Sequence, residues 1–147
     1  MTRWVIEEAC RQNKVWIDKG MPPLIVSVNV SVRLFESQQL LYIVEHALQS
    51  AGLPARYLEL EITESTMMYD VPDMIRQLNE LREIGVRISI DDFGSGYSSL
   101  GSLDQIPIDT IKIDQMFIRE GDSPSKRAIV GAIIDMALFI WNWWLRE

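Results

Sequence analysis

The stretch RISIDDFG, residues 87–94, alternates branched apolar side chains with polar ones and holds two adjacent carboxylates near its end. Three further runs share this arrangement: IVSVNVSV at 25–32, YLELEITES at 57–65 and TIKID at 110–114. Because successive side chains of a β-strand point to opposite faces, each run predicts a strand with one apolar and one polar face. The polar faces carry Asn29, Glu61, Asp91 and Lys112.

Amphipathic helices are predicted between these strands, where apolar residues recur at helical spacing and glycines mark the ends. The expected helices cover residues 2–19, 37–51 and 72–84, and a last one opens at Ser123 with Pro124 in its first turn. The Gly- and Ser-rich segment 93–107 predicts a loop with a short helical turn. Strands that alternate with helices indicate right-handed crossovers and a parallel sheet, hence the α/β class, with the polar face toward a barrel interior.

Composition indicates one globular domain in a reducing compartment. The chain has 147 residues, 48% of them hydrophobic and 24% charged. Its net charge of -7 disfavours a nucleic-acid polymer as partner, since such binding needs clustered basic residues. The single cysteine, Cys10, lies on the apolar stripe of the first helix and is expected in the core. The start, MTRWVIEEACRQ, has acidic residues where a signal peptide needs an apolar stretch, so nothing suggests secretion. We expect a cytoplasmic location, either for the whole protein or as the cytoplasmic part of a membrane-anchored one.

The polar residues near the strand ends predict a cation site. Ligands of parallel sheets bind at the carboxyl ends of the strands, where Asn29, Glu61 and Asp91 are expected to meet. Carboxylates about 4 Å apart repel by about 4 kcal/mol per pair at an effective dielectric near 20, which one lysine cannot offset. Mg²⁺ or Mn²⁺ can, and the pair Asp91–Asp92 could serve two ions. Lys112 would orient an attacking water or stabilise developing negative charge.

Two other interpretations of these residues stay open. In the first, they form a buried polar network in which Lys112 pairs with Asp114 or Asp91 and Asn29 caps the arrangement. In the second, they line a solvated barrel mouth. His46, which lies mid-helix beside Glu45, is expected to be a surface or partly packed residue.

Four motifs closely resemble the EAL domain family of cyclic di-GMP phosphodiesterases: VNVSVRLF at 28–35, LELEITES at 58–65, DDFGSGYSSL at 91–100 and IDTIKID at 108–114. The resemblance implies a TIM-like barrel and metal-dependent hydrolysis of cyclic di-GMP to linear pGpG. It also implies Mg²⁺ or Mn²⁺ as cofactor, with Ca²⁺ as an inhibitory substitute. The residues carried over are Asn29, Glu61 and Asp91 as metal ligands, Asp92 as ligand of a second ion, Lys112 as the water-orienting catalytic residue beside Glu61 and Asp91, and Glu64 as the residue that stabilises the DDFG loop.

The resemblance covers the middle of the family's domain, so we expect residues 1–147 to be an incomplete EAL domain and a partial TIM-like barrel of about four parallel strands. The strand with the namesake Glu-Ala-Leu motif and the later strands are not recognised, and residues 138–147, LFIWNWWLRE, form an atypical hydrophobic tail. The chain alone is expected to be inactive or nearly so. The alternatives are a non-catalytic cyclic di-GMP binding or regulatory module and a self-associating remnant.

A four-stranded piece of a barrel leaves two edges and an interior face exposed, which predicts a homodimer or higher self-association that completes or covers the sheet. The tail helix is apolar nearly all round, with Ile129, Ile133, Met136, Ile140 and Trp144 on one stripe and Val130, Ile134, Trp141 and Leu145 beside it. A membrane span, or a tail altered by truncation or a shifted reading frame, are the other interpretations. GGDEF or sensory domains are expected partners in a parent protein.

Overall fold

The protein is described by a computed structural model that covers residues 2–68, 71–94, 105–119 and 123–144. Helices alternate with strands along the chain, and two short 3₁₀ turns (η1, η2) flank β2. The elements, in order, are α1 (Thr2–Asp18), β1 (Val26–Asn29), α2 (Val32–Glu36), α3 (Leu40–Ala51), η1 (Ala55–Tyr57), β2 (Leu58–Thr63), η2 (Glu64–Met68), α4 (Val71–Glu83), β3 (Arg87–Phe93), β4 (Thr110–Ile113), α5 (Met116–Arg119) and α6 (Pro124–Trp144).

The four strands form one parallel sheet in the order β1-β2-β3-β4. Helices α3 and α4 connect the first three strands as crossovers, as the alternation of patterns predicts. The sheet is open in the described part of the chain, with β1 and β4 at its edges, so the fold is the α/β partial barrel expected from the sequence.

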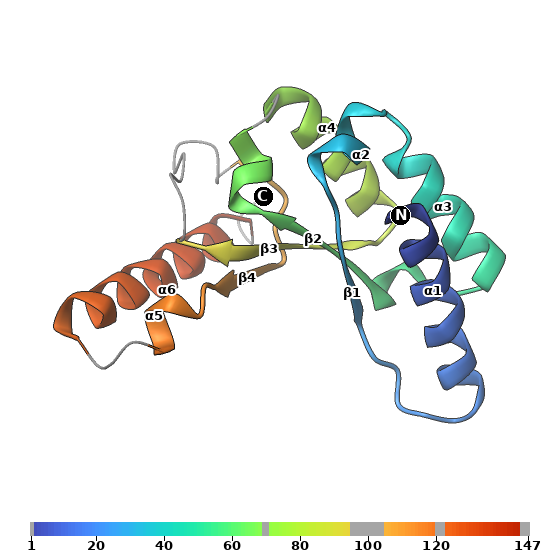
Figure 1. Ribbon diagram of the computed structural model, residues 1–147, viewed down its shortest axis with the longest axis horizontal. Helices are drawn as coiled ribbons and strands as arrows, with labels where there is room; N and C mark the ends of the chain where they lie inside the picture. Colours follow the sequence, from blue (N-terminus) through green and yellow to red (C-terminus); the bar gives the residue numbers. More distant parts are fainter. Residues whose placement is uncertain (1, 69–70, 95–104, 120–122, 145–147) are drawn as a thin grey trace.

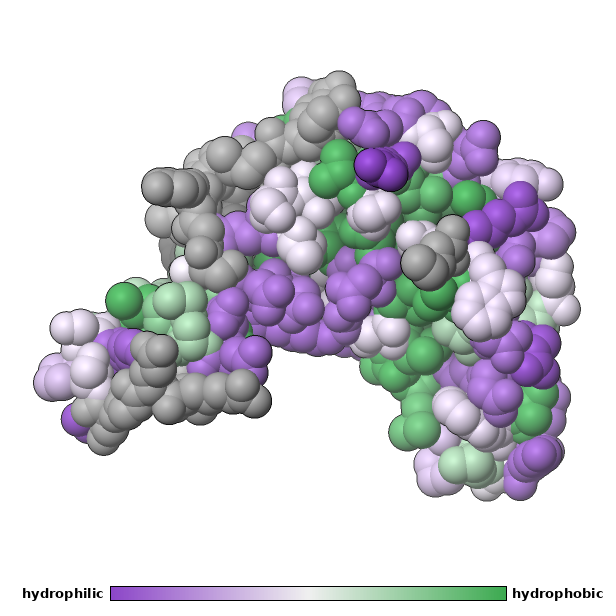
Figure 2. Space-filling model, viewed as in Figure 1, coloured by the Kyte–Doolittle hydropathy of each residue, from purple (hydrophilic) through white to green (hydrophobic). Residues whose placement is uncertain are grey.

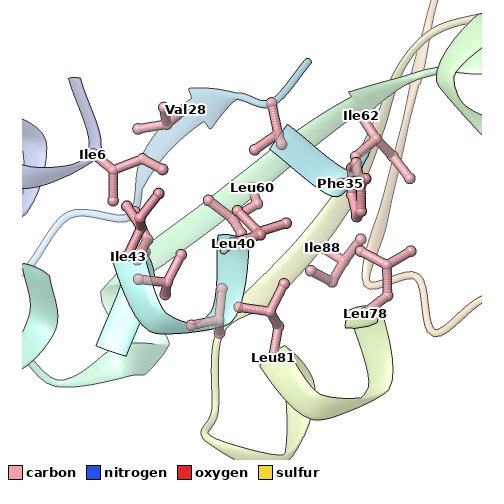
Figure 3. Close-up of a cluster of buried hydrophobic side chains, with 14 of the residues drawn as sticks. Ile6, Val28, Phe35, Leu40, Ile43, Leu60, Ile62, Leu78, Leu81 and Ile88 are labelled. Carbon is pink, nitrogen blue, oxygen red and sulfur yellow. The ribbon is translucent and has the colours of Figure 1, made fainter. Parts of the chain in front are cut away.

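The core lies between the sheet and helices α1 to α4. Leu58, Leu60 and Ile62 of β2 are fully buried, as are Ile88 and Ile90 of β3. Figure 3 shows side chains from these strands converging with others from the covering helices. Full burial of one such side chain contributes about 1.5–3 kcal/mol, which explains why the apolar face of each strand is fixed toward the helices. The helix side chains that complete this core are Ile6, Cys10, Phe35, Leu40, Ile43, Val44, Ala47, Leu48, Met74, Leu78 and Leu81.

The predicted helix over 37–51 begins later than expected, at Leu40, and the five-residue helix α2 before it was not predicted. Gln38 explains the interruption, because its φ of 55° lies in the left-handed region and ends the helical path. The side chain of Gln38 then bonds to α4, donating to Asp73 Oδ2 and accepting from Arg76. Two tertiary hydrogen bonds therefore hold a backbone conformation that the sequence pattern does not reveal.

Two single-residue expectations are confirmed. Cys10 is buried in the core, and burial raises the pKa of its thiol to about 11. His46 is exposed on α3, with its ring 6.1 Å from that of Tyr42. Asn13 was not anticipated: it is buried on α1, and its amide donates to the carbonyls of Leu24 and Tyr57.

Helices α5 and α6 lie at the β4 end of the molecule, away from α1 (Figure 1). The expected start of the last helix is confirmed, because the Lys126 N–H donates to the Ser123 hydroxyl as an N-cap. Ile133 is buried against the core, whereas Ile129, Ile134 and Leu138 are exposed. Among the described residues, no helix is both long and apolar enough to span a bilayer. Most of the predicted loop, residues 95–104, and the side chains of Ile140, Trp141, Trp144 and Leu145 lie outside the described part.

Candidate functional site

The predicted site residues stand near the C-terminal ends of the four strands. Asn29 is the last residue of β1 and pairs in register with Glu61 of β2. Glu61 pairs in turn with Ser89 of β3, and Ser89 with Thr110 of β4. Because in-register side chains of a parallel sheet share a face, Asn29 and Glu61 point away from the helix-covered core. Hydrophilic surface fills the middle of Figure 2, between the α1 end and the α5–α6 end.

A β-bulge places Asp91 and Asp92 together. Ile90 pairs with Ile111 and Phe93 with Ile113, so Asp91 and Asp92 both stand opposite the single residue Lys112. Because of the extra residue, Ile90 and Phe93 are both buried on the apolar side of the sheet. The backbone of Asp92 adopts a left-handed conformation at the bulge, with a φ of 55°. Bulges occur next to active sites, where they re-aim side chains. In a regular strand, Asp92 would have pointed into the core.

The charges at the bulge are close enough to affect one another. The Asp91 carboxylate raises the pKa of Asp92, with smaller contributions from desolvation and from the charges of Asp114 and Glu61. Like charges near a carboxyl disfavour its ionised form. The carboxylates that act on Asp92 therefore come from β2, from β3 and from Asp114, which directly follows β4.

Lys112 forms an ion pair with Glu61 Oε1 across the intervening strand β3, and its Nζ lies 3.7 Å from Glu59 Oε1. Burial lowers the pKa of Lys112, but the hydrogen bond to Glu61 and the charges of Glu61, Glu59 and Asp91 outweigh it, and the net pKa is raised. The alternative interpretation as a buried polar network paired Lys112 with Asp114 or Asp91, whereas the structure pairs it with Glu61. Asp114 instead accepts the Met116 N–H at the start of α5.

Glu59 is a further member of the polar face that sequence reasoning missed. It is buried, accepts a hydrogen bond of 2.9 Å from Ser27 and one of 3.3 Å from Thr110, and lies 3.8 Å from Arg87 Nε. Its position two residues before Glu61 on the same strand face was the available signal. These contacts lie two residues before Glu61 on the same face of β2. They satisfy the buried Glu59 carboxylate and link β2 to β1, β3 and β4 next to the site.

Ser89 was also missed. Its side chain is fully buried on the polar face, and its hydroxyl has no hydrogen-bond partner within the described residues. Ser89 lies two residues before Asp91, on the same strand face, which was the signal that could have singled it out.

Glu64 contacts the DDFG segment directly. The Gly94 N–H donates to Glu64 Oε2 over 3.1 Å, and Glu64 is buried. Gly94 has a φ of +93°, and a Cβ at this position would lie 2.7 Å from Phe117 Cε2. A glycine is therefore required both by the backbone conformation and by the close approach of α5.

The donor chemistry of this edge fits a hard divalent cation. Asn29, Glu61, Asp91 and Asp92 offer amide and carboxylate oxygens, the ligands that Mg²⁺ and Mn²⁺ prefer. Among the described residues, no three Asp, Glu, His or Cys side chains are gathered closely enough to enclose an ion. Mg²⁺ usually keeps several waters and uses one or two carboxylates, so an open set of this kind suits it. The raised pKa of Asp92 reflects repulsion between carboxylates, which a bound cation would relieve, and the Ser89 hydroxyl has no hydrogen-bond partner among the described residues.

A cavity of about 150 Å³ lies elsewhere, between α2 and α4, and none of its lining residues is a predicted site residue. It is lined by Val32, Phe35, Glu36, Gln38, Thr66, Asp73 and Met74.

The open four-stranded parallel sheet, with carboxylates, an amide and a lysine near the strand ends, is the α/β architecture of part of a barrel with an acidic polar face. The family model of the EAL domain matches residues 1–138. The chain belongs to the EAL domain family. The cyclic di-GMP phosphodiesterase NbdA of Pseudomonas aeruginosa is 44% identical over 137 residues, and the signalling protein YkoW of Bacillus subtilis is 44% identical over 135. Each alignment covers 91% of this chain and 17% of the relative.

A solved structure of the MucR phosphodiesterase in complex with cyclic di-GMP superposes with a TM-score of 0.87 at 41% identity. The match covers 94% of this chain and 56% of that one. MucR of P. aeruginosa is named as a bifunctional diguanylate cyclase and cyclic di-GMP phosphodiesterase. The chain thus spans a minor part of its curated relatives and about half of a solved EAL domain.

Proposed function

We propose that this chain carries the central, cation-binding part of a cyclic di-GMP phosphodiesterase site. The observation that carries the proposal is the bulge that brings Asp92 beside Asp91 on the face that holds Glu61 and Lys112. The named activity of NbdA and the ligand in the MucR structure support cyclic di-GMP as the substrate. The product is pGpG, formed when a water oxygen bonds to one phosphorus and a single phosphodiester P–O bond breaks.

Each residue has a distinct role in this proposal. Asn29, Glu61 and Asp91 would hold one divalent ion, Mg²⁺ or Mn²⁺, and Asp92 a second, while Ca²⁺ would bind without supporting turnover. The ions supply positive charge that offsets the negative charge of the phosphodiester as it develops. Lys112 leaves Glu61 and orients the attacking water by donating through Nζ. Glu64 keeps the DDFG segment in place through the Gly94 N–H.

Binding is the first test. Calorimetry with cyclic di-GMP in the presence of Ca²⁺ should show binding that Asp91→Asn abolishes, because Ca²⁺ prevents turnover during the titration. Asp18→Asn is the matched control, since Asp18 is exposed on α1 and lies outside the site. An unchanged affinity in Asp91→Asn would contradict the assigned ligands.

Turnover is the second test, measured as pGpG released after incubation with Mn²⁺. We expect little or none from the chain alone, because it spans about half of the solved MucR phosphodiesterase chain, and among the described residues helices α1 to α4 cover one face of the sheet and leave the polar face open. Measurable pGpG that Asp91→Ala abolishes would overturn this expectation of inactivity and support catalysis by the chain itself.

The Lys112–Glu61 pair favours one alternative, a non-catalytic module that binds cyclic di-GMP and regulates a partner. In such a module the pair persists when the ligand binds, and no ion is needed. The two functions differ in one readout: affinity for cyclic di-GMP should depend on the divalent ion in the phosphodiesterase, and be the same with EDTA in the binding module.

Self-association completes the proposal. Leu24 and Ile25 just before β1, and Ile134 and Leu138 on α6, are exposed apolar side chains that are suited to contact a second copy. Gel filtration should show a homodimer at micromolar concentration that Leu138→Lys weakens. Ala132→Lys, an exposed position on the same helix, is the control. A stable monomer would remove the dimer from the proposal.

The remaining parts of the proposal concern the cell. We place the chain in the cytoplasm with companion GGDEF or sensory domains; the bifunctional cyclase and phosphodiesterase name of MucR supports a GGDEF companion. Limited proteolysis of the native protein, followed by mass spectrometry, would identify such domains.

A further inference from the structure

Ser89 occupies the centre of the polar face. It pairs in register with Glu61 on one side and Thr110 on the other. Its neighbours Ile88 and Ile90 are buried on the helix side, so the Ser89 side chain points to the opposite face. Ser89 therefore stands between the strand that carries Glu61 and the strand that carries Lys112.

Two contacts connect β4 with β2, the strands on either side of Ser89. The Thr110 hydroxyl donates to Glu59 Oε2, and the Lys112 ammonium pairs with Glu61 Oε1. Both run from β4 to β2, with β3 between them, and this explains why Ser89 is fully buried although it lies on the open face. A large side chain at this position would keep Lys112 away from Glu61.

Small size alone does not account for a serine. Buried hydroxyls in proteins nearly always have a hydrogen-bond partner, and each exception needs an explanation. The Ser89 hydroxyl has none among the described residues, and alanine would meet the size requirement without leaving a donor unpaired. We therefore expect the Ser89 hydroxyl to form a hydrogen bond in a second conformation of the polar face, in which the neighbouring side chains have moved.

Glu61 is the acceptor in reach of such a rearrangement. In-register residues of neighbouring strands lie about 4.7–4.9 Å apart, a separation that rotation of both side chains can bridge. Lys112 now occupies one oxygen of Glu61. A divalent cation at Glu61 repels the ammonium, and the departure of Lys112 leaves a carboxylate oxygen open to a new donor.

We infer that Ser89 is a positioning residue for Glu61: its hydroxyl donates to the carboxylate once a divalent cation has displaced Lys112. The inference rests on the proposed function, since it needs the cation at Glu61. Hydrogen bonds to ligating carboxylates fix their orientation, and their loss typically weakens metal binding by 10- to 100-fold. The Ser89 hydroxyl thus has no hydrogen-bond partner in the ion-free protein and gains one, the Glu61 carboxylate, when the ion binds.

The test compares Ser89→Ala with Ser27→Ala. Ser27 lies on the same polar face, but its hydroxyl already donates to Glu59. Two quantities are measured for each variant: the melting temperature in EDTA and the Mn²⁺ dissociation constant by calorimetry. Ser89→Ala should bind Mn²⁺ about 10- to 100-fold more weakly while its melting temperature in EDTA is unchanged or higher. Ser27→Ala should lower the melting temperature and leave Mn²⁺ affinity within twofold.

A purely structural serine would not separate the two quantities in this way. If the unaltered chain binds Mn²⁺ and Ser89→Ala binds it equally well, the inference is overturned and the proposed function stands. If Ser89→Ala binds Mn²⁺ more weakly and also melts earlier in EDTA, the hydroxyl is structural and the inference is again overturned. If the unaltered chain binds no Mn²⁺ at millimolar concentration, both the proposed function and this inference fall.

Discussion

Lys112 on β4 reaches over β3 to pair with Glu61 on β2, so the two residues connect strands that are not neighbours in the sheet. Glu61 is buried, whereas Lys112 is half-exposed. When the pair is broken, water can solvate the Lys112 ammonium, but the Glu61 carboxylate stays buried without a partner charge. The raised pKa of Lys112 means that the contribution of the pair is fully present below the ordinary value of 10.5 and is lost only as pH rises through the raised value.

Lys112→Met should therefore lower the free energy of unfolding at pH 7 by about 1–3 kcal/mol, the cost of an unsatisfied buried group. Glu61→Gln in the same chain should recover part of the loss. Lys14→Met is the control, because its partner Asp18 is exposed on the same helix and such pairs contribute about 0.3–0.5 kcal/mol. Urea unfolding measures all four proteins. Equal losses in Lys112→Met and Lys14→Met would refute a special role for the pair.

Asp92→Asn should stabilise the ion-free protein, because the pKa of Asp92 is raised above its ordinary value of 3.8, chiefly by Asp91. A carboxyl with a raised pKa in the folded state favours folding below its unfolded pKa, and this contribution is lost as pH rises through the folded pKa. The variant and the parent should hence be equally stable near pH 3.5, and the variant should gain as pH rises to 7. Melting curves in EDTA across this range test the sign, and a gain that is largest at low pH would contradict it.

Gly94→Ala should destabilise the fold by about 1–3 kcal/mol, the usual cost of a side chain in a sparsely populated backbone region. The φ of +93° and the 2.7 Å approach of Phe117 Cε2 act in the same direction. Gly131→Ala is the matched control: it lies within α6 with no described atom within 4 Å of the added Cβ, and should gain about 0.5–1 kcal/mol. If both variants shift stability alike in urea unfolding, the conformational argument for Gly94 fails.

Asn13→Ala should cost about 1–3 kcal/mol, because it leaves the carbonyls of Leu24 and Tyr57 without their amide donor in a part-buried place. The change also removes the hydrogen bond between α1 and Leu24 in the segment before β1. Hydrogen exchange of the Val26 backbone amide should therefore be faster. Gln12→Ala, on the neighbouring face of the helix, should stay within about 0.5 kcal/mol. An exchange rate at Val26 unaffected by Asn13→Ala would show that the helix is held by its apolar contacts alone.

The strands were predictable because alternation of side chains is local information. Each of the four runs contains its strand, and the ends differ by a few residues: β1 stops at Asn29, and α2 already begins at Val32. The last helix was predictable for the same reason, since Ser123 and Pro124 mark its start. Gln38 was not, because its left-handed conformation is held by bonds to Asp73 and Arg76 on a distant helix.

The candidate site shows the same division. Alternation in the sequence places Asn29, Glu61, Asp91 and Lys112 on one face of the sheet. The partner of Lys112, however, depends on the strand order, which puts β3 between β2 and β4, and on the small Ser89 side chain of β3. Two consecutive aspartates carry no sign of a bulge, because the irregularity arises from pairing with β4. Tertiary pairing therefore decided the contacts that local pattern left open.

The bulge also determines how this segment can change in length during evolution. Removing one residue between Ile90 and Phe93 would restore strict alternation and leave only one acidic side chain where two now stand, although every other letter of the motif survived. A family member with such a deletion would score well in an alignment and still lack half of its anionic pair. Counting residues across this segment is consequently a simple test of competence for any relative.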